Sequence, residues 1–185
     1  MNHPFMERAG AALESRGIAT HRYDFPYMKA GKNRPDSPAV AQAAVREAVA
    51  EAAREAPGVP IFAGGKSFGG RMTSQAQAQE PLPGVRGLVF FGFPLHAPGR
   101  PGIERAEHLS AVQVPMLFLQ GTRDEFATLE LLQGVVDRLG KRASLHLIEE
   151  GDHSFRVPKR TGKTEQDVMN ELAETIQHWA ARTNG

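Results

Sequence analysis

The stretch "VPIFAGGKSFGGRM", residues 59–72, holds two overlapping motifs that predict different chemistry. Gly65, Lys66 and Ser67 form the tripeptide that ends a phosphate-binding P-loop, but they also begin a Gly-x-Ser-x-Gly nucleophile elbow. A P-loop needs another glycine five residues before Gly65, because its backbone N–H groups must wrap the phosphates. Pro60 occupies that position and has no N–H to donate. The P-loop interpretation is therefore rejected.

The nucleophile-elbow interpretation fits the surrounding pattern. A short apolar strand at 59–64 runs directly into a helix that should extend to about Gln79, with Ser67 at the turn between them. Residues two places before and after the nucleophile must be small, because their Cβ atoms would collide, and Gly65 and Gly69 stand there. Ser67 is expected at the N-terminus of the helix, where free N–H groups favour developing negative charge.

Strand-like and helix-like patterns alternate along the whole chain, which predicts an α/β fold with a mostly parallel sheet of about five strands covered by helices on both faces. We expect a single domain over residues 1–185. The longest connection, 93–113, is expected to hold a short helix near 103–110. Strands are expected at 18–25, 59–64, 86–92, 114–121 and 143–150, the last near a sheet edge, and further helices at 4–17, 37–58, 129–140 and 164–182.

Two loops that follow strands carry partners for a serine nucleophile. A serine hydroxyl needs a base within hydrogen-bond reach, and the base needs a carboxylate that fixes its tautomer. Asp124 in "GTRDEF" and His153 in "EEGDHSF" follow the last two strands and complete the order Ser67, acid, histidine. Glu125 remains an alternative acid. Asp152 is interpreted as a turn residue, because adjacent side chains rarely face each other.

Composition excludes several classes of protein. The chain has no cysteine, so disulfides, thiolate zinc sites and a cysteine nucleophile are ruled out. A net charge of +1 gives no reason to expect nucleic acid as a partner, and no apolar run approaches the length of a membrane span. No secretion signal is recognisable at the start, so the default location is cytoplasmic. Neither a metal nor a cofactor is expected, and the oligomeric state is left open.

The short 93–113 connection predicts an open, shallow pocket without a large lid. Candidate walls of that pocket are Phe93, His96 and Phe126.

Several motifs occur together along the chain: "RYDFPYM" (22–28), "GGKSFGGRM" (64–72), "LVFFGFPLHAPGRP" (88–101), "LQGTRDEF" (119–126) and "EEGDHSF" (149–155). In combination they resemble the small dienelactone-hydrolase-like branch of the α/β-hydrolases, which includes a testis-expressed eukaryotic protein and a subunit of a histone acetyltransferase complex. The resemblance implies the α/β-hydrolase fold, with Ser67 as nucleophile, Asp124 as acid, His153 as base and the N–H of Phe68 as an oxyanion donor. Dienelactone hydrolases themselves use a cysteine nucleophile, so the branch says little about the substrate.

The resemblance also leads to an expectation about the start of the chain. Relatives of this kind have an apolar strand and an "HGAGA"-like loop directly before the segment that matches "MNHPFM". That strand would lie between those expected at 18–25 and 59–64, and its loop would supply the second oxyanion donor. We therefore expect that Met1 is an internal methionine of a longer natural chain.

Two functional hypotheses follow. The first is a serine hydrolase that cleaves a small ester, thioester or lactone through an acyl-enzyme. The alternative is a catalytically weak or inactive scaffold of the same fold that acts in protein interaction.

Overall fold

Over residues 4–183, four parallel strands form one sheet, and they lie side by side in chain order. They are β1 (Ile61–Lys66), β2 (Val85–Phe91), β3 (Met116–Gly121) and β4 (Ala143–Ile148). The computed structural model describes residues 4–183, so the ends of the expected 1–185 domain and the first residues of "MNHPFM" lie outside the described residues. The predicted α/β class with a parallel sheet is confirmed, and β4 lies at a sheet edge as expected.

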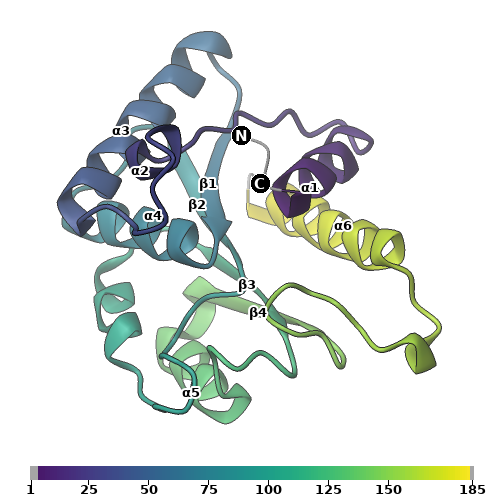
Figure 1. Cartoon of the computed structure of the whole chain (residues 1–185). Coiled ribbons are helices and arrows are strands. Elements are labelled where there is room, and N and C mark those ends of the chain that lie inside the picture. The colour runs from purple at the N-terminus through teal and green to yellow at the C-terminus, as the bar shows by residue number, and fades with distance from the viewer. Residues whose placement is uncertain (1–3, 184–185) are drawn as a thin grey trace.

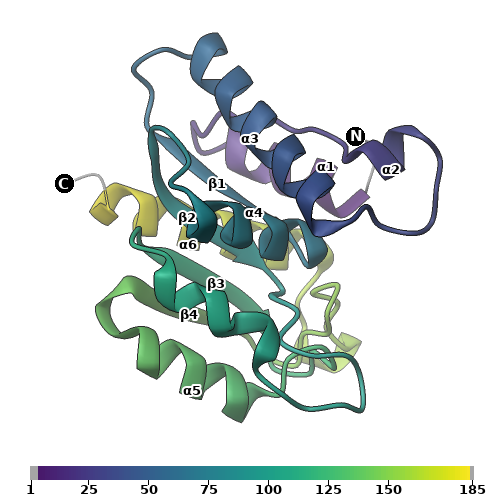
Figure 2. The ribbon, with the colours of Figure 1, turned by 90° about the vertical axis from the view of Figure 1, so that its left-hand side faces the viewer.

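Helices cover both faces of the sheet (Figures 1 and 2). On one face lie α3 (Pro38–Glu55), α4 (Phe68–Gln79) and α5 (Leu129–Leu139), and on the other lie α1 (Pro4–Glu14) and α6 (Glu165–Thr183). The side chains of β2 alternate between the two hydrophobic cores: Leu88 and Phe90 pack with α3, α4 and α5, whereas Val89 and Phe91 pack with α1 and α6. A continuous apolar run is therefore the expected pattern for this strand.

The remaining elements are short. Helix α2 (Pro26–Lys29) precedes α3, and the 3₁₀ helices η1 (Glu104–Ala111), η2 (Gly140–Arg142) and η3 (Lys159–Thr161) lie in connections. The helix expected near 103–110 is therefore present, in the tighter 3₁₀ form. Ser37 precedes α3 as expected, but its side chain makes no capping hydrogen bond.

The strand expected at 18–25 is absent, and this prediction is wrong. Within residues 4–183, β1 pairs with β2 alone, so its other edge has no strand partner. The 18–25 segment forms no regular element, and its aromatic side chains pack on α4: the ring of Phe25 lies 5.4 Å from that of Phe68 and 5.4 Å from that of Tyr23. The ring of Phe25 is thus buried without the hydrogen-bonded ladder of a strand.

Candidate active site

Ser67 stands alone between the end of β1 and the start of α4. Its backbone has φ 50° and ψ −115°, and residues with a Cβ rarely adopt such a positive φ. Its N–H donates to the carbonyl oxygen of Phe91 at 3.0 Å, which joins the turn to β2. Such strain persists where the surrounding structure imposes it, and it is typical of a nucleophile elbow.

Close packing at the turn explains two of the glycines around Ser67. A Cβ on Gly70 would lie 2.7 Å from the carbonyl oxygen of Gly65, and a Cβ on Gly65 would lie 3.0 Å from the carbonyl carbon of Gly69. Gly69 itself was expected to need its small size, but the nearest atom to a Cβ there would be a ring carbon of Phe25 at 3.7 Å, an ordinary contact. The steric requirement therefore falls on Gly70, one residue later than predicted.

Ser67, His153 and Asp124 form a continuous chain of hydrogen bonds, although they come from three separate loops. The Oγ of Ser67 lies 2.9 Å from Nε2 of His153, and Nδ1 of His153 lies 2.7 Å from Oδ2 of Asp124. A carboxylate accepts only, so Nδ1 carries the proton and Nε2 of a neutral imidazole is free to accept from the hydroxyl. The three side chains are thus arranged for removal of the serine proton.

Asp124 is fully enclosed and well supported. Its side chain has no solvent exposure, and it also accepts hydrogen bonds from the N–H of Phe126 at 2.8 Å and from Nε2 of Gln120 at 2.5 Å. The Oε1 of Gln120 in turn accepts from the N–H of Phe93 at 2.9 Å. Gln120 was missed by the sequence reasoning, although a polar residue at the end of the apolar run "VPMLFLQG" was a usable signal.

The two other carboxylates considered at the sequence level lie apart from this chain of hydrogen bonds. Glu125 is exposed. Asp152 accepts hydrogen bonds from the N–H groups of Ser154 and Arg156, both at 2.8 Å, which is the turn role expected for it.

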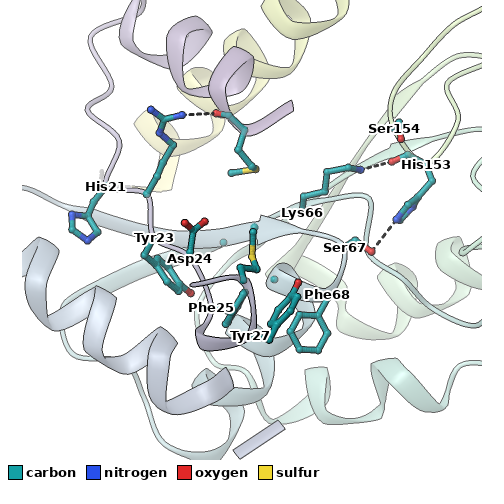
Figure 3. A pocket seen from close by; sticks show the side chains of 16 residues that line it. His21, Tyr23, Asp24, Phe25, Tyr27, Lys66, Ser67, Phe68, His153 and Ser154 are labelled. Carbon is teal, nitrogen blue, oxygen red and sulfur yellow. Dashed lines mark hydrogen bonds between the residues drawn. The ribbon is translucent and has the colours of Figure 1, made fainter. Parts of the chain in front are cut away.

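A cavity of about 440 Å³ opens beside Ser67, along the unpaired edge of β1 (Figure 3). One side is formed by Gly64, Gly65 and the elbow, and the other by residues 21–28, while His153 and Ser154 close one end. Aromatic and thioether side chains dominate its apolar wall: Met6, Tyr23, Phe25, Tyr27, Met28 and Phe68. Burial raises the pKa of Tyr23 to about 12, so its hydroxyl stays neutral.

The three residues expected to line the pocket do not line this cavity. Phe93 is only 1% exposed and packs between Phe90 and Phe118 in the core. His96 is also buried, and its ring nitrogens lie 2.9 Å from the carbonyl of Ala97 and 2.9 Å from the hydroxyl of Thr128. The ring of Phe126 instead packs at a tilt against the imidazole of His153, with 4.3 Å between the ring centres. The loop after β2 turns inward, which a count of loop residues cannot reveal.

Phe68 is the first residue of α4, and it directly follows Ser67. The first N–H groups of a helix have no partner within the helix, so the N–H of Phe68 is available beside the serine hydroxyl. The helix dipole adds a partial positive charge at the same place.

Lys66 lies on the other side of Ser67 and is largely enclosed. Its ammonium group donates to the backbone carbonyl of His153 and lies 4.9 Å from the ring centre of Phe5 and 5.3 Å from that of Phe155. Burial lowers the pKa of Lys66 to about 8, although the carboxylates of Asp124 and Asp152 oppose this change.

Over residues 4–183, no group of three or more histidine, aspartate or glutamate side chains is arranged to hold a metal ion. In the same part of the chain, no helix has the length and apolar character that crossing a membrane requires.

Comparison with known proteins agrees with the fold. Residues 1–181 match the alpha/beta hydrolase domain family, and the chain therefore belongs to that family. The fold and the elbow described above are those of its members.

Solved structures of similar fold come from several bacteria. An alpha-beta serine hydrolase homologue from Coxiella burnetii superposes with a TM-score of 0.71 at 18% identity, over 96% of this chain and 76% of that chain. An α/β serine hydrolase without a lid from Xanthomonas campestris gives 0.68 at 20% identity, over 97% and 75%. Est1E from Butyrivibrio proteoclasticus, solved with ferulic acid bound, gives 0.71 at 15% identity, over 99% and 84%.

Proposed function

We propose that this protein is a serine hydrolase that cleaves a small ester, thioester or lactone through an acyl-enzyme on Ser67. The observation that carries the proposal is the pair of hydrogen bonds from Ser67 to His153, at 2.9 Å, and from His153 to Asp124, at 2.7 Å. Esterases and serine hydrolases among proteins of similar fold support the same reaction class. The sequence motifs favour the small dienelactone-hydrolase-like branch of the family.

In the proposed reaction, the Oγ of Ser67 attacks the carbonyl carbon of the substrate while Nε2 of His153 takes the hydroxyl proton. The buried carboxylate of Asp124 stabilises the imidazolium that forms. Collapse of the tetrahedral intermediate breaks the bond to the leaving group, which receives the proton from His153. A water molecule, deprotonated by His153, then attacks the acyl-enzyme and releases the acid and free Ser67.

The negative charge on the substrate oxygen would be stabilised by the N–H of Phe68 at the start of α4. A second donor is usual in this fold. By the family resemblance, this donor would come from an "HGAGA"-like loop.

The cavity also favours a class of substrate. Aromatic and methionine side chains around Ser67 suit an acyl or alcohol group that is apolar, and about 440 Å³ is enough for a small molecule.

The direct test is intact mass after exposure to a fluorophosphonate, which reacts only with an activated serine. We expect a single adduct on the wild-type chain and none on Ser67→Ala. Ser154→Ala is the matched control, because Ser154 lines the same cavity but has no hydrogen bond to His153 that would activate it. A folded wild-type chain that takes no adduct, or an adduct that survives Ser67→Ala, would contradict the proposal.

A further inference from the structure

Lys66 links the nucleophile to the loop that carries the base. It is the last residue of β1, so its backbone leads directly into Ser67. Its side chain extends toward the His153 loop, away from the aromatic wall of the cavity, and its ammonium group donates to the carbonyl oxygen of His153 (Figure 3). One residue therefore contacts both partners of the 2.9 Å hydrogen bond between Ser67 and His153.

The loop after β4 needs such support because its backbone is strained. Glu150 has φ 57° and Phe155 has φ 61°, both in the left-handed region that residues with a Cβ avoid. The start of the loop is held by the N–H of Arg123, which donates to the carbonyl of Gly151 at 2.9 Å. Beyond Asp152, the carbonyl of His153 is held from outside the loop by Lys66.

We propose that Lys66 is a positioning residue: by holding the backbone carbonyl of His153, its ammonium group keeps the imidazole directed at Ser67. This inference rests on the proposed function of Ser67 and His153. The bond is charge-assisted and sits between the rings of Phe5 and Phe155, where little water competes with it. A base displaced by a fraction of an ångström removes the serine proton less efficiently, so the effect should fall on the chemical step.

The hold depends on the protonation of Lys66. The charged groups that act on it are the carboxylates of Asp124 and Asp152, which favour the ammonium form, while burial, the larger effect, favours the neutral amine. The helix α1 and the loop after β4 face it with the rings of Phe5 and Phe155. With its pKa lowered to about 8, the ammonium form prevails at neutral pH and is lost as the pH rises through that value.

The test compares Lys66→Met, which removes the charge and keeps the length, with Lys66→Arg, which stays charged at all pH values used. Lys141→Met, at an exposed lysine of η2, is the matched control. The readouts are kcat and KM for a neutral and an anionic nitrophenyl ester, and the rate of fluorophosphonate modification, from pH 6.5 to 9.5. We expect Lys66→Met to lower kcat and the modification rate about 10- to 100-fold with little change in KM.

Two further results are expected of the positioning role. Lys66→Arg should recover most of the rate at pH 7 and keep it above pH 8, where the wild-type rate falls. A rise in KM for the anionic ester alone, with kcat unchanged, would overturn the proposal and make Lys66 a substrate-binding residue instead.

Hydrogen exchange separates this inference from the proposed function. We expect Lys66→Met to speed exchange at the amides of residues 151–156 and to leave those of β2 and β3 unchanged. If the wild type reacts with the fluorophosphonate but exchange and kcat are unaltered in Lys66→Met, the Lys66 inference alone is wrong. If the folded wild type never reacts, the proposed function fails, and the Lys66 inference fails with it whatever the exchange shows.

Discussion

Replacement of Asp124 by asparagine tests whether this buried carboxylate is the acid that supports His153. The carboxylate accepts from three donors, on His153, Gln120 and the backbone of Phe126. An amide of the same shape has one oxygen and one NH2, so it cannot accept from all three. If the NH2 faces His153, the imidazole must accept through Nδ1 and carry its proton on Nε2, which can then no longer take the proton of Ser67.

The size of the expected loss in kcat follows from the lost negative charge of Asp124 as well as from the wrong tautomer of His153. With Oδ2 and Nδ1 2.7 Å apart, the centres of carboxylate and imidazolium lie somewhat farther from each other. At an effective dielectric constant of about 20, their attraction is roughly 4–6 kcal/mol. Each 1.36 kcal/mol is a factor of ten in rate, so Asp124→Asn should lower kcat by about 10³- to 10⁴-fold.

The assay is ester hydrolysis together with the rate of fluorophosphonate modification, and both rates should fall. Glu125→Gln is the matched control, since it neutralises the neighbouring exposed carboxylate, which was the alternative acid. Its rates should stay within about twofold of the wild type, as expected for a screened surface charge. A small effect of Asp124→Asn, or a large one of Glu125→Gln, would refute the assignment of the acid.

Two other predictions concern stability. Gly70→Ala should lower the free energy of unfolding by about 1–3 kcal/mol, because its Cβ would lie 2.7 Å from the carbonyl oxygen of Gly65. Gly69→Ala, whose Cβ meets no such contact, should be neutral or stabilising by up to about 1 kcal/mol. The urea midpoints of the two variants test this, and an equal loss of stability in both would contradict it. His108 is held neutral mainly by burial, which lowers its pKa to about 4, while an unfolded chain takes up that proton near 6.5. The contribution of neutral His108 to stability is therefore complete above about pH 6.5 and declines as the pH falls toward 4. The difference in urea midpoint between the wild type and His108→Gln should narrow over that range. A difference that stays constant with pH would refute this prediction.

Much of the elbow could be predicted from local sequence because its determinants are local. Apolar residues leading into a glycine-rich turn and a helix specify a tight strand–helix junction, and the order Ser67, Asp124, His153 follows from parallel strands whose ends share one edge of the sheet. The residues whose predicted positions were wrong are placed by contacts with residues distant in the sequence. Phe93 looked like a pocket wall, yet its N–H is drawn inward by Gln120, 27 residues later.

The segment 18–25 shows the same limit at the level of the fold. The segment "IATHRYDF" running into Pro26 predicts a strand, but whether a segment joins a sheet depends on an available neighbour. Here Phe25 is buried against Phe68 of α4, and the ladder hydrogen bonds of a strand are absent. The sequence analysis considered Lys66 only as a phosphate lysine, because its contact with His153 spans 87 residues and has no local signature.

The one-sided pairing of β1 has a consequence for how the protein loses activity. Within residues 4–183, β1, which leads into Ser67, is anchored by one row of backbone hydrogen bonds, whereas β2 and β3 are anchored by two. Segments with fewer such bonds open at lower free energy than the rest of a domain. Mild urea or warming should therefore abolish the reactivity of Ser67 before most of the helices unfold. The loss of reactivity and the loss of the helical circular dichroism signal should then have different midpoints.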